Sequence, residues 1–184
     1  DEEEDVEIEK SLEQALAAKE EGNRLFRDKE HASAALAYTR AIDLCPTGDE
    51  SADHMATFFG NRAACHQAMG ETALVVEDCT DSLECKPGYV KVLNRRCQAY
   101  ETLKQYDEAV EDAKKIVELD PSFPNGQSNI TRLTRLAEKR NEEMKDEALG
   151  KLKELGNSIL GNFGMSLDNF KMTQDPGTGS WNVR

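Results

Sequence analysis

Three stretches of the chain end alike: Ala41-Ile42-Asp43-Leu44-Cys45-Pro46, Ser82-Leu83-Glu84-Cys85-Lys86-Pro87 and Ile116-Val117-Glu118-Leu119-Asp120-Pro121. Each is an apolar and acidic run closed by a proline, which is typical of the end of a helix. Pro121 follows Pro87 by 34 residues, whereas Pro87 follows Pro46 by 41. The difference matches the polar stretch 48–54, which we interpret as a longer connection between the first two units of a repeat.

Between these prolines, apolar residues recur at helical spacing. In the first unit Ala34, Tyr38 and Ala41 share one face of the second helix of a pair. Gly22 is the small residue that lets the two helices approach, and Cys97 takes the corresponding place in the third unit. No stretch of useful length alternates as a half-buried strand does. The sequence therefore predicts an all-α protein built from helix pairs.

A different pattern begins after Pro124. An apolar residue recurs about every 3.6 positions among Lys, Arg and Glu, at Ile130, Leu133, Ala137, Met144, Ala148, Leu152, Leu155 and Ile159. A stack of helix pairs leaves its last pair with an uncovered apolar face. We predict that this stripe, including Leu133, Leu152 and Leu155, covers that face. A surface for a partner helix is the alternative.

These observations divide the chain into seven segments. They are an acidic, partly helical leader (1–14), the first repeat (15–48), a loop (49–55), the second repeat (56–89), the third repeat (90–123), a capping helix (124–160) and a mobile tail (161–184). Because the chain opens with an acidic run at Asp1 and not with Met, we expect it to be a fragment of a longer protein.

Composition and motifs argue against several classes of function. The net charge of −13 is unfavourable for binding nucleic acid. Five cysteines without a C-x-x-C pair and three scattered histidines predict no metal site, and we expect reduced thiols in a cytoplasmic protein. The apolar runs are shorter than the roughly 20 residues of a membrane helix. With no phosphate-binding glycine loop and no nucleophile elbow, we expect neither a cofactor nor enzymatic activity.

The repeated pattern resembles the tetratricopeptide repeat family over about 15–122. The resemblance implies a right-handed superhelical array of helix-turn-helix repeats with a long C-terminal capping helix. The first helix of each repeat would line a concave face. A narrower likeness covers residues 149–157, 163–164 and 169–170, which are similar to the C-terminal segment of a three-repeat member of the family.

Five polar residues match the dicarboxylate clamp of chaperone-binding members of that family. They form Lys19-x-x-x-Asn23, Asn61-Arg62 and Lys91-x-x-x-Arg95, so the resemblance assigns peptide binding to Lys19, Asn23, Asn61, Lys91 and Arg95. Two like charges four residues apart repel by a few tenths of a kcal/mol on a bare helix, so this spacing suits an anionic ligand. We expect Phe26, three residues after Asn23, to form an apolar wall beside them.

The resemblance also implies the partner. The ligand would be the acidic Glu-Glu-Val-Asp tail of cytosolic heat-shock chaperones of the 70 and 90 kDa classes, and the protein a co-chaperone-type adaptor. Gln67 and Thr102, at other groove positions, leave the choice between the two classes open. The alternative function is a protein-interaction scaffold that acts mainly through its C-terminal helix, with another partner.

Overall fold

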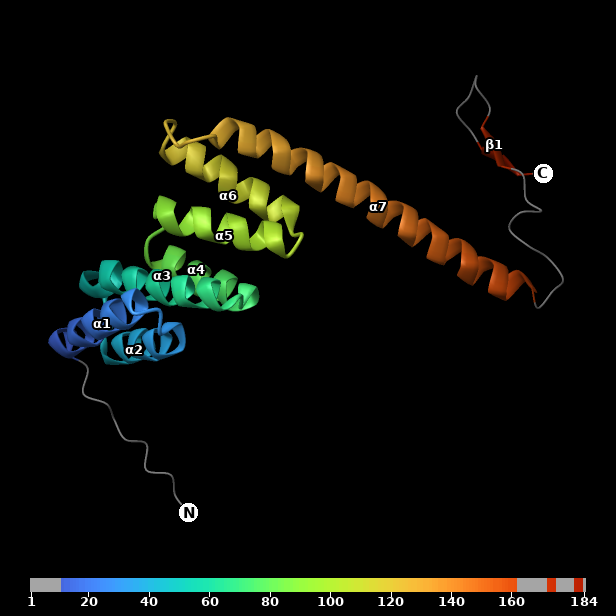
Figure 1. Ribbon diagram of the computed structural model, residues 1–184. Helices are drawn as coiled ribbons and strands as arrows, with labels where there is room; N and C mark the ends of the chain where they lie inside the picture. The colour runs from blue at the N-terminus through green and yellow to red at the C-terminus, as the bar shows by residue number, and fades with distance from the viewer. Residues whose placement is uncertain (1–10, 162–171, 175–180, 184) are drawn as a thin grey trace, which may run out of the picture. The chain divides into compact units, whose positions relative to one another are not determined.

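Helices make up most of the protein. The computed structural model describes residues 11–161, 172–174 and 181–183 (Figure 1). They fall into two units that divide between Ala137 and Glu138. The elements are α1 (Leu12–Arg27), α2 (His31–Leu44), the 3-10 turn η1 (Asp49–Ser51), α3 (Ala52–Met69), α4 (Thr72–Cys85), α5 (Val90–Thr102), α6 (Tyr106–Leu119), α7 (Gly126–Gly161), β1 (Met172–Gln174) and β2 (Trp181–Val183).

In the first unit the helices form three successive pairs. The pairs α1–α2, α3–α4 and α5–α6 follow one another along the chain, and α2 packs on α3 as α4 packs on α5 (Figure 1). The predicted all-α array of helix-turn-helix pairs is confirmed.

The turn inside each pair has the same left-handed geometry. Lys29, Gly70 and Lys104 adopt positive φ angles of 65°, 78° and 60°. The residue after each of them donates its amide N–H to the carbonyl five residues earlier, as Glu71 does to His66 at 3.0 Å. This arrangement satisfies carbonyl groups that the end of a helix leaves unpaired. Only the second of the three turns uses glycine, the residue without steric cost there.

Close packing inside the first pair depends on Gly22. The residue is buried, and a Cβ atom added there would lie 2.8 Å from Cε1 of Tyr38. The absent side chain therefore leaves room for the Tyr38 ring, which is itself 2 % exposed. This confirms Gly22 as the predicted small residue between the two helices.

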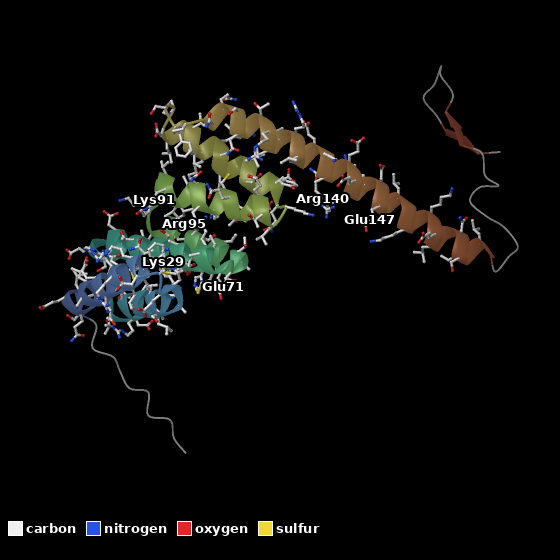
Figure 2. All side chains as sticks on the ribbon, in the orientation of Figure 1. Lys29, Glu71, Lys91, Arg95, Arg140 and Glu147 are labelled. Carbon is white, nitrogen blue, oxygen red and sulfur yellow. The ribbon has the colours of Figure 1, made fainter. Side chains whose placement is uncertain are left out.

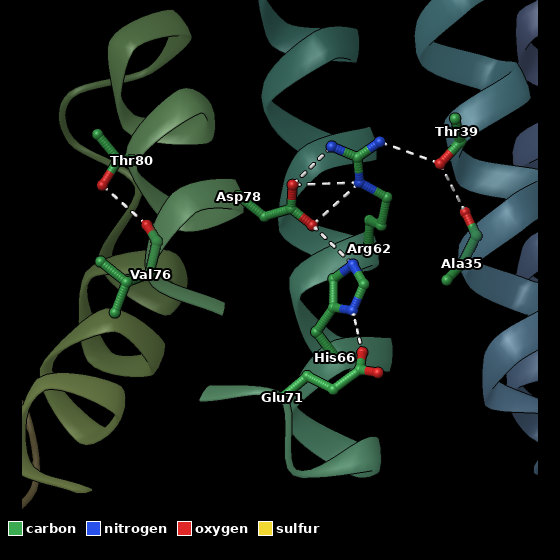
Figure 3. Close-up of polar contacts among 8 residues, drawn as sticks. All are labelled: Ala35, Thr39, Arg62, His66, Glu71, Val76, Asp78 and Thr80. Carbon is green, nitrogen blue, oxygen red and sulfur yellow. Dashed lines mark hydrogen bonds and ion pairs between the residues drawn. The ribbon is translucent and has the colours of Figure 1, made fainter. Parts of the chain in front are cut away.

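Two buried ion pairs join neighbouring helices at equivalent places, 34 residues apart. Arg62 of α3 donates to Asp78 of α4 with Nη2–Oδ1 2.7 Å and to Thr39 Oγ1 of α2 at 3.0 Å. Figure 3 shows this cluster, in which His66 Nδ1 also lies 2.6 Å from Glu71 Oε2. Arg96 of α5 repeats the arrangement with Asp112 and Thr80. Each arginine therefore ties three helices together.

The boundary between the first two repeats differs from the prediction. The segment 49–55 was expected as a loop, but it contains η1 and the first turn of α3. Tertiary packing explains the helix, because Met55 and Phe58 join an apolar cluster with Ala15 and Ala41. The predicted leader over 1–14 overlaps the first helix, because α1 begins at Leu12. Residues 1–10 lie outside the described residues.

The predicted apolar stripe of α7 is covered over only part of its length. Leu133 is fully buried among Cys97, Ala109, Val110 and Ala113, so the start of the helix packs on the third pair. In the second unit, by contrast, Leu152 and Leu155 are 65 % and 60 % exposed. Leu152 and Leu155 belong to the second unit, so their coverage of the last repeat stays a prediction.

The second unit comprises the rest of α7 and a short hairpin. Strands β1 and β2 pair antiparallel, with Thr173 opposite Asn182. The prediction of a mobile tail over 161–184 falls mainly on residues outside the described set. None of the helices in the described part of the chain is long and apolar enough to cross a membrane.

Candidate functional site

The first helices of the three pairs together line a groove. Its cavity holds about 280 Å³ and is lined by Asn23, Phe26, Arg27, Tyr38, Asn61, Ala64, Lys91 and Arg95. Five of the six residues singled out from the sequence are among them, although they come from α1, α3 and α5. Lys19, the sixth, is one helical turn before Asn23 on α1. Stacking of the pairs thus brings together residues that are up to 72 positions apart.

The orientation of the Asn23 amide is set by Tyr38. The phenol of Tyr38 donates a hydrogen bond to Asn23 Oδ1 at 2.7 Å. Burial raises the pKa of Tyr38 to about 12, so the hydroxyl keeps its proton at neutral pH. Because the amide oxygen is occupied, Asn23 offers its N–H donors for other partners. One of them reaches Glu20 Oε2 at 3.3 Å.

Lys19 and Asn23 share a carboxylate of the chain itself. Lys19 Nζ lies 2.8 Å from Glu20 Oε1, and the other oxygen of Glu20 accepts from Asn23. The hydrogen bonds from Lys19 and then from Asn23 lower the pKa of Glu20. This pair of donors therefore already binds a carboxylate, in a position that is open to solvent.

On the opposite side of the groove, Arg95 is held by neutral groups. Its Nε donates to Gln67 Oε1 at 3.0 Å and its Nη1 to the carbonyl of Gly60 at 2.9 Å. Both partners belong to α3, and neither neutralises the guanidinium charge. Figure 2 shows Lys91 and Arg95 on the same side of α5. Lys91 is exposed and forms no ion pair with any residue that the structure describes.

On α3 and on α5, one residue faces the groove and the next residue along the chain forms an ion pair. Asn61 faces the groove while Arg62 is paired with Asp78, and Arg95 faces the groove while Arg96 is paired with Asp112. Arg95 follows Asn61 by 34 residues, and Arg96 follows Arg62 by the same number. On both helices, therefore, the residue next to the groove residue ties the helix to its neighbour.

The groove is locally cationic within an acidic protein. Five arginines of the first unit form ion pairs with carboxylates: Arg24, Arg40, Arg62, Arg96 and Arg132. The groove cations Arg27, Lys91 and Arg95 form none with the residues that the structure describes. Cations without a carboxylate partner are available to an anionic ligand, and two planar guanidinium groups suit a carboxylate.

Sequence reasoning missed three residues of the groove, which are Arg27, Tyr38 and Ala64. Arg27 lies four residues after Asn23, so the helical period alone could have placed it on the same face of α1. Tyr38 was recognised only as a packing residue, and its contact with Asn23 depends on how α2 is stacked against α1. No signal in the sequence reports that contact.

The chemistry of the remaining candidates is structural. Within the described ranges no group of His, Cys, Asp and Glu is arranged to hold a metal ion. None of the five cysteines, all of which lie in the described ranges, forms a disulfide, and four of them are buried. Burial raises the pKa of Cys65 to about 11 and that of Cys79 to about 12, which keeps these thiols protonated.

Comparisons with known proteins agree on the type of repeat. Residues 90–123 match the tetratricopeptide repeat family. Over 119 residues the chain is 40% identical to sperm-associated antigen 1 of Rattus norvegicus, which covers 64% of this chain and 13% of that protein. The chain thus spans a small part of that relative's length. The solved tetratricopeptide domain of Arabidopsis OM64 is 30% identical with a TM-score of 0.58, over 67% of this chain and 97% of that one.

The chain belongs to the tetratricopeptide repeat family.

Two solved complexes of yeast Sti1 are also similar to this tetratricopeptide protein. One is described as its TPR2B domain with pHsp70, at 26% identity and a TM-score of 0.55, covering 69% of this chain and 98% of that one. The other is its TPR2AB domain with pHSP90, at 27% identity and a TM-score of 0.56, covering 70% and 48%. Within the family, the chain is related to domains that bind chaperones.

Proposed function

We propose that the groove binds the acidic C-terminal Glu-Glu-Val-Asp peptide of heat-shock chaperones of the 70 and 90 kDa classes, and that the protein is a cytoplasmic co-chaperone-type adaptor without enzymatic activity. One observation carries the proposal: cations without carboxylate partners and amide donors from three helices converge on one groove. Its likeness to the Sti1 domains solved with pHsp70 and pHSP90 supports the identity of the ligand.

The proposed ligand contacts follow from the donors available. Lys19, Asn23 and Asn61 would bind the terminal carboxylate, as Lys19 and Asn23 already bind the carboxylate of Glu20. Lys91 and Arg95 would bind the side chain of the last Asp. Phe26 contributes the apolar wall against which the Val packs. Hydrogen bonds between ionised groups are stronger than neutral ones, so the charged residues dominate the affinity.

Binding is tested by titration of the protein with a synthetic free-acid peptide ending in Glu-Glu-Val-Asp. Replacing Lys91 or Arg95 with Ala removes a charge-assisted hydrogen bond of about 1.5–3 kcal/mol. That corresponds to an affinity loss of about 10- to 150-fold. Arg24→Ala is the matched control, because Arg24 carries the same charge and pairs with Asp28 outside the groove. Unchanged affinity in both groove variants would contradict the proposal.

An amidated peptide of the same sequence tests whether the groove binds a chain end. Amidation removes the charge that Lys19, Asn23 and Asn61 would bind, so affinity should fall without being abolished. Both peptides experience nearly the same long-range repulsion from the acidic protein, so the comparison isolates the local contact. Equal affinities would mean that the groove binds an internal acidic motif.

A second candidate function rests on the exposed face of α7. Met144, Leu152, Leu155 and Ile159 are each more than half exposed. An apolar helix face of this kind fits a partner helix, so the alternative is a protein-interaction scaffold that acts mainly through its C-terminal helix. Leu152→Asp with Leu155→Asp should abolish binding to such a partner and leave the affinity for the acidic peptide unchanged.

A finer relationship within the family is also proposed. Residues 149–157 resemble the C-terminal segment of tetratricopeptide repeat protein 1, which likewise follows three repeats, and helix caps vary more than repeats do. Sequencing the complete natural transcript tests this, since an orthologue should align with that protein from end to end.

A further inference from the structure

Arg27 is a groove cation outside the five positions of the clamp. It is the last residue of α1 and lines the same cavity as Asn23, Phe26, Lys91 and Arg95. Its side chain is exposed, and no carboxylate pairs with it among the residues that the structure describes. Its charge is a minor cause of the lowered pKa of Glu20, with which it forms no ion pair. A guanidinium group beside two other cations favours a bound anion.

Stabilisation of the helix end does not distinguish this residue from Arg24. A cation near the C-terminus of a helix interacts favourably with the helix dipole. Arg24, in the same last turn, already serves that purpose and pairs with Asp28 at 3.6 Å. Arg24 does not line the groove, whereas Arg27 does. The two arginines differ in surroundings but not in charge.

The position of Arg27 on α1 relates it to an upstream part of the ligand. Arg27 follows Lys19 by eight residues, which is about 12 Å along the helix axis. An extended peptide advances about 3.3 Å per residue, so this separation spans three or four residues. Asn23, which is also proposed to bind the terminal carboxylate, is four residues from Arg27, or about 6 Å along the axis. Arg27 therefore lies about two to four residues from the chain end, a range that includes both Glu side chains.

We propose that Arg27 is a specificity-determining residue that binds a carboxylate side chain of the peptide upstream of its last two residues. The inference rests on the proposed function, and it narrows the ligand to peptides with a third acidic group beyond the terminal carboxylate and the last side chain. The groove then discriminates among acidic chain ends by the residues before the terminal pair.

A double-mutant cycle tests the contact. The probes are four synthetic free-acid peptides: one ending in Glu-Glu-Val-Asp and three in which the first Glu, the second Glu or both are replaced by Gln. The proteins are the unmodified chain, Arg27→Gln and the matched control Arg24→Gln. For an exposed pair, we expect about three- to fivefold weaker binding when Arg27 alone is replaced. The same loss is expected when only the Glu that contacts Arg27 is replaced by Gln. In Arg27→Gln, the peptide with both Glu replaced should bind as well as the original.

The outcomes separate this inference from the function on which it rests. The Arg24→Gln variant should keep the full preference for Glu over Gln. If Arg27→Gln also keeps the full preference for Glu over Gln, the contact between Arg27 and the peptide is excluded. If Lys91→Ala and Arg95→Ala lose affinity in the same experiment, the proposed function remains. If the unmodified chain binds none of the four peptides, the proposed function and this inference are both overturned.

Discussion

At the scale of single residues, a carboxylate of the chain itself contacts two of the proposed ligand-binding donors. Glu20 contacts both Lys19 and Asn23, the donors proposed for the terminal carboxylate of the ligand. In the proposed binding mode, an incoming peptide displaces Glu20 from these two donors. We therefore expect Glu20 to compete with the terminal carboxylate of the peptide.

Replacing Glu20 with Gln should strengthen binding of the free-acid peptide. The variant removes the competing carboxylate, and for an exposed contact the expected gain is about two- to fivefold in affinity. Isothermal titration calorimetry measures the change. The control is Glu13→Gln, on the same helix and equally negative but away from Lys19. If both variants gain equally, the effect is long-range repulsion and the local competition is refuted.

At the scale of elements, ion pairs join α3 to α4 and α5 to α6. Asp78 is buried and binds Arg62 through both of its carboxylate oxygens. Breaking such a pair leaves a cation with little access to water and no counter-charge, which is far more costly than losing an exposed pair. The neighbouring groove residue Asn61 depends on the same helix orientation.

Asp78→Ala should therefore lower the free energy of unfolding by about 2–4 kcal/mol. Glu77→Ala is the control, since Glu77 is the adjacent exposed carboxylate on α4, and it should change stability by less than about 0.5 kcal/mol. Urea unfolding followed by circular dichroism measures both. A small effect of Asp78→Ala would show that the pair contributes orientation but little stability.

The cap on the last repeat belongs to the same scale. Leu133 and Ala137 are buried, whereas the apolar residues from Met144 onward are exposed. A chain ending after Asn125 exposes the face that Leu133 covers, and burial of one leucine is worth about 1.5–3 kcal/mol. It should melt well below the full chain or aggregate. A chain ending after Glu142 should melt like the full chain in differential scanning calorimetry; a large loss there would assign a covering role to the later residues.

At the scale of the whole molecule, buried thiols make stability sensitive to alkaline pH. Burial raises the pKa of Cys65 and of Cys97 to about 11 and that of Cys79 to about 12. Their unfolded value is 9.0. A group with a raised folded pKa contributes stability that is fully present below the unfolded pKa and is lost as the pH rises towards the folded one.

The free energy of unfolding should consequently be constant from pH 7 to about 8.5 and fall between pH 9 and 11. Each of the three thiols should account for roughly 1 kcal/mol at pH 10. Urea midpoints at pH 7.5 and 10 measure the loss. The Cys79→Ala variant serves as a control, since it should start less stable because of the cavity but decline less with pH. Equal midpoints at the two pH values would show that the thiols ionise freely in the folded state.

Local periodicity explains what the sequence alone determined. The proline spacing, the small residues Gly22 and Cys97 and the 3.6-residue period predicted the helix pairs, because a helix and its faces depend on residues a few positions apart. The same logic put Lys91 and Arg95 on one face of one helix. It could also have found Arg27.

Contacts between repeats were decided only by the tertiary structure. Which cations lack a carboxylate partner, and that Tyr38 orients Asn23, depends on helices that are distant in the sequence and meet by stacking. The stripe on α7 shows the same limit. Its period is uniform from Ile130 to Ile159, yet Leu133 is buried and Leu155 is exposed, because burial requires a neighbouring surface and the helical period specifies only a face.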